Sequence, residues 1–179
     1  MVRAFIALDL SDEIKRQLAS AQQTLRGCRS RFTFVEPKNI HITAKFLGEV
    51  EECDLPEVVD ALKTIISVPF QVTARKVTVN NPRRPHTVWC TIEDAGESEK
   101  VFQQIEDVLE PLGFPRETRP FTPHATIARV KSSDQSLFSA LRTLDKISYG
   151  SCSINGITLK KSTLLPSGPA YEDLLVMKW

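Results

Sequence analysis

Apolar residues follow two different periods along this chain, and glycine, proline and short polar runs separate the segments. Alternation with a period of two predicts strands, because successive side chains of a strand point to opposite faces. Strands are expected over residues 3–10, 31–35, 40–47, 70–80, 87–92, 121–130 and 173–179, with two more between 147 and 165. Within that stretch, Asn155-Gly156 is the strongest hairpin signal in the chain.

Four other segments carry apolar residues at helical spacing. The first begins after Ser11, which with the two acidic residues that follow is typical of a helix N-terminus, and it ends near Gly27. The others are expected over residues 54–66, 97–112 and 134–144. Strands in hairpins, interspersed with helices, predict an α+β fold of antiparallel sheet with helices on its outer faces.

The order of strands and helices in the first half of the chain largely recurs in the second half. This recurrence predicts two similar lobes related by a pseudo-two-fold axis, with a central groove between them. A chain of 179 residues suits one globular domain. We therefore expect a single bilobal domain over residues 1–179.

One tetrapeptide pattern, His-x-Thr-x, occurs once in each half. It is His41-Ile-Thr-Ala44 in the expected strand 40–47, and His124-Ala-Thr-Ile127 in the expected strand 121–130. Alternation places the histidine and the threonine of each copy on one strand face, about 7 Å apart, and the apolar residues on the other. A pseudo-two-fold axis would turn both pairs toward the same groove.

A single His-x-Thr arises often by chance, and a lone histidine in a strand is usually structural. The duplication changes this interpretation, because two of the three histidines in the chain lie in the same pattern and the same expected local structure. Histidine can donate or accept a proton near neutral pH, and hydroxyl groups can donate hydrogen bonds to an oxyanion. We therefore predict a catalytic site built from His41, Thr43, His124 and Thr126.

Composition narrows the class of protein. Hydrophobic residues make up 41% and charged residues 25%, which is ordinary for a soluble protein. The 23 basic and 22 acidic residues leave a net charge of +1, so an anionic ligand must be bound by a local cluster. No apolar run reaches the roughly 18 residues of a membrane span, and the four cysteines form no Cys-x-x-Cys pair. We expect a cytoplasmic monomer without a membrane segment.

Both motifs extend into segments that resemble the paired signatures of a known family. Residues 41–49 (His-Ile-Thr-Ala-Lys-Phe-Leu-Gly-Glu) and 119–129 (Arg-Pro-Phe-Thr-Pro-His-Ala-Thr-Ile-Ala-Arg) are similar to those of the two-histidine phosphoesterases. The resemblance is to the RNA 2′,3′-cyclic phosphodiesterases, formerly called 2′-5′ RNA ligases, and residues 3–8, 88–89 and 164–171 extend it over nearly the whole chain. It implies a bilobal fold, an active site in the groove, and neither cofactor nor metal.

The resemblance implies hydrolysis of a 2′,3′-cyclic phosphate at an RNA end. Opening this ring needs a base for water, an acid for the departing ribose oxygen, and donors for the phosphoryl oxygens. By resemblance, His41 is the proton donor to O3′ and His124 the proton acceptor, so that the product is a 2′-phosphate. Thr43 and Thr126 would bind the non-bridging oxygens, and each imidazole would contribute about 10²- to 10⁴-fold.

Two basic residues next to the motifs are candidates for binding the phosphate. Lys45 would share the strand face of His41, although a solvated surface lysine is an equal alternative. Arg129 resembles an anion-binding arginine of the family. Strict alternation nevertheless places Arg129 on the face opposite to Thr126, unless the strand twists or bulges there.

Tyr171 and Phe5 are candidates for the groove wall or for stacking on a base, although aromatic residues in strands are more often part of the core. Other basic residues would bind a longer RNA backbone or be solvated loop charges; they are Arg83, Arg84, Arg116, Arg119, Lys160 and Lys161. His86 lies outside both motifs, between Pro85 and Thr87, and is expected in a loop.

Three other functions are compatible with these residues. The same chemistry in reverse, with a ribose hydroxyl in place of water, would make the protein an ATP-independent 2′-5′ RNA ligase. A protein that only binds phosphorylated RNA ends would keep the basic loops but would not need both motifs intact. A zinc enzyme could use His41, His86 and His124 as ligands, which would leave the duplicated threonines unexplained.

Overall fold

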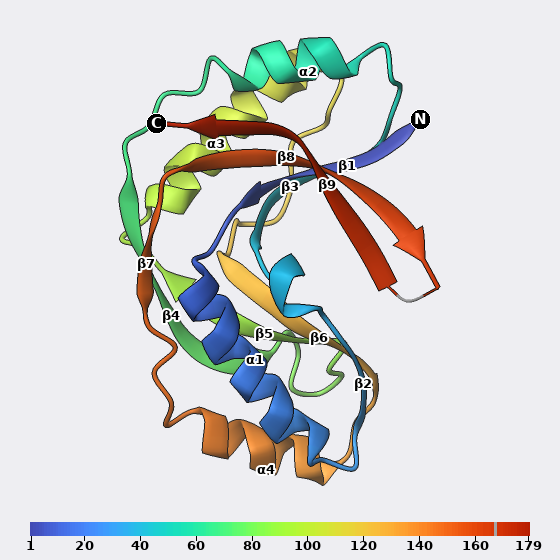
Figure 1. Cartoon of the computed structure of the whole chain (residues 1–179), viewed down its shortest axis with the longest axis vertical. Coiled ribbons are helices and arrows are strands. Elements are labelled where there is room, and N and C mark those ends of the chain that lie inside the picture. The colour runs from blue at the N-terminus through green and yellow to red at the C-terminus, as the bar shows by residue number, and fades with distance from the viewer. Residues whose placement is uncertain (167) are drawn as a thin grey trace.

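The computed structural model describes residues 1–166 and 168–179, so Ser167, within the segment 164–171, lies outside the described residues. In this range nine strands form one antiparallel sheet, and four α-helices pack on it and on one another (Figure 1). The strands are β1 (Val2–Leu8), β2 (Arg31–Phe34), β3 (Ile42–Val50), β4 (Phe70–Val79), β5 (Thr87–Glu93), β6 (His124–Ser132), β7 (Ser151–Ile154), β8 (Gly156–Leu165) and β9 (Gly168–Lys178). The helices are α1 (Asp12–Arg26), α2 (Leu55–Leu62), α3 (Glu97–Leu109) and α4 (Gln135–Leu144), with short 3-10 helices η1 (Pro37–Asn39) and η2 (Glu110–Leu112).

The order of strands across the sheet is symmetric about its middle. It runs β7-β4-β5-β6-β3-β1-β8-β9, and β2 adds to β6. The two motif strands, β3 and β6, are therefore the central pair, and each begins one half of the sheet. This arrangement confirms the α+β fold and places the two motifs side by side.

The helices are exchanged between the two halves. Helix α1 follows β1 but packs on β6 and α4, whereas α3 follows β5 but packs on β3 and α2. Figure 1 shows the result, with α2 and α3 together at one end of the molecule and α1 and α4 at the other. Each half of the chain thus covers a motif strand of the other half. No helix in the described residues is long and apolar enough to cross a membrane.

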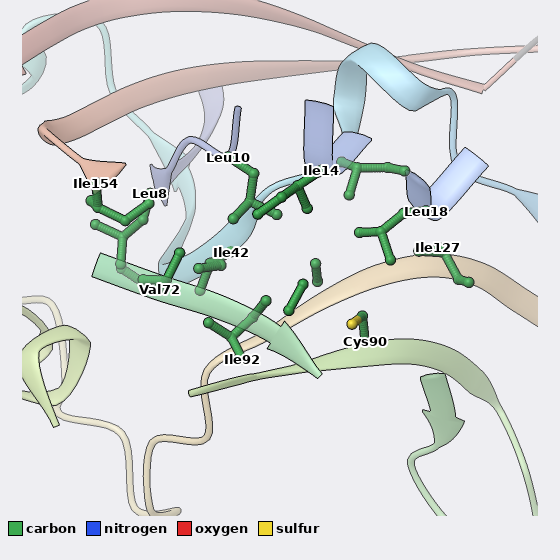
Figure 2. Packing of buried hydrophobic residues seen from close by; sticks show 14 of the residues in the cluster. Leu8, Leu10, Ile14, Leu18, Ile42, Val72, Cys90, Ile92, Ile127 and Ile154 are labelled. Carbon is green, nitrogen blue, oxygen red and sulfur yellow. The ribbon is translucent and has the colours of Figure 1, made fainter. Parts of the chain in front are cut away.

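Helix α1 shows how the sequence pattern produces this packing. The Ser11 side chain accepts a hydrogen bond from the Ile14 amide at 3.3 Å and so caps the helix. The apolar stripe that follows is buried, and Figure 2 shows Ile14 and Leu18 in one cluster with Ile42 and Ile127 of the motif strands. Burying each such side chain contributes about 1.5–3 kcal/mol to the free energy of folding. The apolar faces of both motif strands are therefore fixed by packing against α1.

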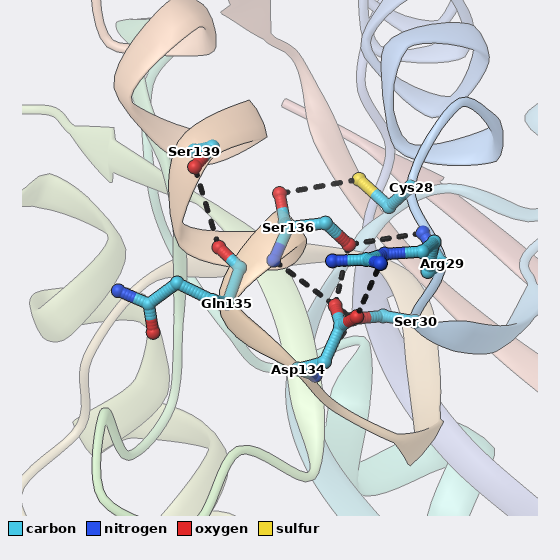
Figure 3. Close-up of polar contacts among 7 residues, drawn as sticks. All are labelled: Cys28, Arg29, Ser30, Asp134, Gln135, Ser136 and Ser139. Carbon is cyan, nitrogen blue, oxygen red and sulfur yellow. Dashed lines mark hydrogen bonds and ion pairs between the residues drawn. The ribbon is translucent and has the colours of Figure 1, made fainter.

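A polar network joins the end of α1 to the start of α4 (Figure 3). The Asp134 carboxylate accepts hydrogen bonds from the Ser136 amide at 3.0 Å and from the Ser30 hydroxyl at 2.9 Å, and it pairs with Arg29 at 3.4 Å. The Cys28 thiol donates to the Ser136 carbonyl at 3.6 Å. Asp134 is thus the N-cap of α4, and such a cap contributes about 1 kcal/mol to helix stability. Through Ser30 and Arg29 the same carboxylate also connects the end of α1 to the start of α4.

The prediction of a hairpin at Asn155-Gly156 is wrong, because the two strands that it would join do not pair with each other. Strand β7 pairs with β4 at one edge of the sheet, whereas β8 pairs with β1 and β9 at the other end, so the chain crosses between the halves at Asn155. Glycine is required for a different reason: a Cβ at Gly156 would lie 1.8 Å from the Met177 carbonyl oxygen. The close approach of the β9 backbone, and not a tight turn, explains this glycine.

Candidate active site

The central strand pair sets the geometry of the site. Ile42 of β3 pairs with Ala125 of β6, and both are fully buried on the helix side of the sheet. In an antiparallel pair the residues on either side of this position also face one another. The histidine of each motif therefore lies opposite the threonine of the other, on the face of the sheet away from these buried residues, called the groove face below, and the two histidines are diagonal neighbours. Such neighbours are separated by about 7 Å, which leaves room for one phosphate between the imidazoles.

Both imidazoles are held in the same way. The Nδ1 atom of His41 lies 2.7 Å from the Asn39 carbonyl oxygen, and Nδ1 of His124 lies 2.6 Å from the Thr122 carbonyl oxygen. A carbonyl can only accept, so Nδ1 carries the hydrogen in both rings. The reactive nitrogen is then Nε2 in each. Nε2 of His41 is 3.0 Å from the Thr43 hydroxyl.

The charges around the two imidazoles differ. Burial lowers the pKa of His41, while its hydrogen bond to Asn39 and the nearby Asp9 carboxylate act in the opposite direction and nearby lysine ammonium groups add to the lowering. Burial also lowers the pKa of His124, and the Arg129 guanidinium adds to that lowering against the backbone hydrogen bond. The carboxylate favours the protonated form of His41, whereas the guanidinium favours the neutral form of His124.

Aromatic rings support both histidines. The Phe5 ring stacks on His41 at 4.9 Å between centroids, and the Tyr171 ring meets His41 edge-on at 5.6 Å. Trp89 lies 4.2 Å from the His124 ring. Phe5 is only 3% exposed because these neighbours cover it, so it can hold His41 in place but cannot stack on a base. The structure thus brings Phe5 and Tyr171 to the site and adds Trp89, which the sequence analysis did not select.

Each motif is followed by a β-bulge. In β3 the register with β1 passes from Thr43 directly to Lys45 and leaves Ala44 as the extra residue. In β6 the register with β5 passes from Thr126 directly to Ala128 and leaves Ile127 as the extra residue. A bulge moves every later side chain to the other face of the sheet. The two bulges therefore reverse the faces expected from strict alternation.

A model of the family described as LigT like Phosphoesterase matches residues 8–90 and 93–171 of this sequence. The chain belongs to this phosphoesterase family. The match confirms the resemblance that the two motif segments carry. An RNA 2′,3′-cyclic phosphodiesterase of Archaeoglobus fulgidus is 33% identical over 178 residues, covering 99% of this chain and 100% of that protein.

Further relatives support the same family over the whole chain. An RNA 2′,3′-cyclic phosphodiesterase of Methanothermobacter thermautotrophicus is 31% identical over 182 residues, covering 99% of this chain and 98% of that protein. Among solved structures, TT0787 of Thermus thermophilus superposes with a TM-score of 0.82 at 26% identity, covering 98% of this chain and 97% of that one. The fold of this phosphoesterase is therefore shared along its full length.

Lys45 does not lie in the groove of this phosphoesterase, so its expected place near the phosphate is wrong. The bulge turns it toward α3, where its ammonium donates to Glu106 at 2.6 Å and to the Pro115 carbonyl at 2.8 Å. Both side chains of this ion pair are only 2% exposed. Glu106 also accepts from the Glu117 amide at 2.9 Å. Removing one partner of such a buried pair typically costs about 3–5 kcal/mol, so Lys45 has a structural role.

Arg129 lies on the groove face, because the bulge at Ile127 overrides the alternation that argued against it. Residues far away in the sequence stabilise the bulge. The Ile127 carbonyl accepts hydrogen bonds from the Gln22 side chain at 2.9 Å and from the Val35 amide at 3.0 Å. Arg129 is exposed, and its guanidinium donates a hydrogen bond to the Thr87 hydroxyl at 3.4 Å. It is available to bind an anion.

Phe46 occupies the position in β3 that Arg129 occupies in β6, since each follows its motif histidine by five residues. Phe46 is 63% exposed, and its ring lies 6.0 Å from that of Phe5. No sequence signal distinguished it, because alternation places it on the buried face. The groove therefore has a symmetric centre of histidines and threonines, with the exposed Phe46 ring following the first motif and the exposed Arg129 guanidinium following the second.

The remaining candidates lie outside the centre. His86 is exposed in the loop between β4 and β5, where its carbonyl accepts from the Val130 amide at 2.9 Å. Within the described residues, no three His, Cys, Asp or Glu side chains are grouped as a metal site requires. Several of the other basic side chains are paired with acids: Arg116 with Asp107 and Glu110, Lys160 with Asp9 and Asp173, and Lys161 with Glu172.

The charge asymmetry can be tested by replacing Arg129 with glutamine. Removing the cation that disfavours imidazolium should raise the pKa of His124, while that of His41 should stay within error. The measurement is an NMR titration of the imidazole C2 protons. Arg142→Gln, which changes an exposed arginine on α4, serves as the matched control. Unchanged His124 titration in Arg129→Gln would contradict this account of the site.

Proposed function

We propose that this protein hydrolyses the 2′,3′-cyclic phosphate at the end of an RNA to a 2′-phosphate. The observation that carries the proposal is the central cluster, in which two imidazoles of the same tautomer and two threonine hydroxyls face one space from adjacent strands. The names of the two relatives, both RNA 2′,3′-cyclic phosphodiesterases aligned over nearly the full chain, support the substrate class.

In this proposal the two histidines act on opposite sides of phosphorus. Nε2 of His124 takes a proton from water as the water oxygen forms its bond to phosphorus. The bond from phosphorus to O3′ breaks, and Nε2 of protonated His41 gives its proton to O3′. Thr43 and Thr126 donate hydrogen bonds to the non-bridging oxygens. Two neighbouring charges support these roles: Asp9 favours protonated His41, against the opposite effect of Lys160 and Lys15, and Arg129 favours neutral His124.

The substrate orientation follows from the position of the acid. O3′ stays with the ribose, so the nucleoside must lie on the His41 side of the groove. That side carries the exposed Phe46 ring, whereas the corresponding position on the His124 side carries Arg129. We therefore assign Phe46 to stacking on the terminal base and Arg129 to the phosphate. Stacking of one base on an aromatic side chain contributes about 1–3 kcal/mol and tolerates any base.

Product analysis tests the reaction itself. An oligonucleotide ending in a 2′,3′-cyclic phosphate should be converted to the 2′-phosphate, in the presence of EDTA, and chromatography against 2′- and 3′-phosphate standards identifies the product. A 3′-phosphate would reverse the assigned orientation. Activity lost in EDTA and restored by a divalent ion would favour the zinc enzyme. Joined ends without hydrolysis would favour the ligase, and bound but unchanged ends a binding protein.

The roles of the imidazoles can be separated by the leaving group. His41→Ala and His124→Ala should each lower the rate on the cyclic phosphate by about 10²- to 10⁴-fold. A nitrophenolate departs without a proton, so on an aryl phosphodiester that the wild type accepts, His41→Ala should keep much of the rate and lose the alkaline limb of the pH profile. His124→Ala should fail on both substrates. Recovery of His124→Ala instead would exchange the two roles.

Phe46→Leu tests the assigned side of the nucleoside. Loss of the ring should raise KM for the cyclic phosphate of RNA about tenfold while kcat changes less than twofold, because stacking binds the ground state and the transition state alike. Ile66→Ala, at an apolar residue that is 82% exposed outside the groove, is the control. If Phe46→Leu raised KM as much for a substrate without a terminal base as for one with a base, Phe46 would not be a stacking residue.

A further inference from the structure

Strand β1 has one face in the core and one face in the groove. Its core residues are Ala4, Ile6 and Leu8. Phe5, on the other face, packs against the His41 ring, so Arg3 shares the groove face by alternation. The Arg3 side chain is exposed. An arginine thus lies on the same surface as the catalytic imidazole, two residues beyond the ring that supports it.

The register with β3 orders these groups along the groove. Ala7 pairs with Thr43 of the first motif, Phe5 with Phe46, and Arg3 with Glu49. Moving outward from the motif, the groove face therefore presents a threonine, then an aromatic pair, then an arginine. The four residue steps from Ala7 to Arg3 span about 13 Å of strand, and the long arginine side chain can reach back over part of that distance.

Tyr171 links Arg3 to Arg129, the cation that follows the second motif. Its ring lies 4.9 Å from Phe5 and 5.6 Å from His41. Burial raises the pKa of the Tyr171 phenol, and both Arg129 and Arg3 act against that rise. The charges of both arginines therefore act on this one phenol, Arg129 from the strand of the second motif and Arg3 from the outer part of β1.

Arg3 has charge available for a ligand. Within residues 1–166 and 168–179, no carboxylate oxygen lies within 4.0 Å of its guanidinium. Lys160, the other cation that faces the groove beside Phe5, is instead paired with Asp9 at 3.2 Å and Asp173 at 2.7 Å. The cross-strand neighbour Glu49 is exposed and would oppose an anion at this position.

We propose that Arg3 binds the phosphodiester on the 5′ side of the terminal nucleotide, so that the groove selects RNA ends over free nucleoside cyclic phosphates. An RNA end carries further phosphates only in the 5′ direction. If the reacting phosphate lies at the motifs and the terminal base on Phe46, the next phosphate lies further out on the same lobe, which is where Arg3 is exposed. This inference rests on the substrate orientation proposed above.

The test compares two substrates with the same terminal base: a nucleoside 2′,3′-cyclic phosphate, and a dinucleotide ending in a 2′,3′-cyclic phosphate. The ratio of kcat/KM for the dinucleotide over the mononucleotide should fall about tenfold in Arg3→Gln and rise in Glu49→Gln. The slope of log KM for the dinucleotide against log salt should fall by about 0.7, the value for one phosphate contact on a single strand. Arg142→Gln should leave the ratio unchanged.

An unchanged ratio in Arg3→Gln, or an equal loss on both substrates, would overturn the proposal, because Arg3 would then have no role or would act on the reacting phosphate or the fold. A binding measurement separates this result from a failure of the proposed reaction. Calorimetry with a dinucleotide 3′-phosphate and a nucleoside 3′-phosphate needs no turnover. Tighter binding of the dinucleotide by the wild type, lost in Arg3→Gln, would support the site even if the protein hydrolysed neither cyclic substrate.

Discussion

The pairing of Ile42 with Ala125 is the contact on which the site depends. It is the point where the two halves of the sheet meet, and its two side chains are buried under the exchanged helices. A slip of one residue in either strand would turn that strand's histidine and threonine into the core and its apolar residues onto the opposite face, which the burial energy on the helix side opposes. Apolar packing on one face thus fixes the spacing of the histidines and threonines on the other.

The two bulges explain how a symmetric centre has unsymmetric surroundings. Up to the motif threonines the strands follow the same alternation, and each then gains an extra residue directly after its threonine, with a second one in β3 at Leu47. The shift puts Lys45 and Ala128 on the buried side and Phe46 and Arg129 on the groove side. Acid–base chemistry needs two similar imidazoles, whereas a substrate with a base at one end and a phosphate at the other needs two different flanks.

Charge and burial act together in the centre. Both imidazoles donate Nδ1–H to a backbone carbonyl two residues earlier, so the motif supplies its own orientation. Burial lowers the pKa of both rings; Asp9 acts against this lowering at His41 while Lys160 and Lys15 add to it, and Arg129 adds to it at His124. Two copies of the same local structure thus place their imidazoles among different neighbouring charges.

Local sequence determined much of this protein. Alternation, helical spacing and capping placed the strands and helices, and the repeated His-x-Thr predicted the candidate site, because these features depend on neighbours within a few residues. Only the tertiary structure decided on which face of the sheet Lys45, Phe46 and Arg129 lie. It also decided why a glycine is required at position 156. The bulge at Ile127 is held by Gln22, and Gly156 is required by the β9 backbone near Met177. Such contacts join residues that are distant in the chain, so no local period records them.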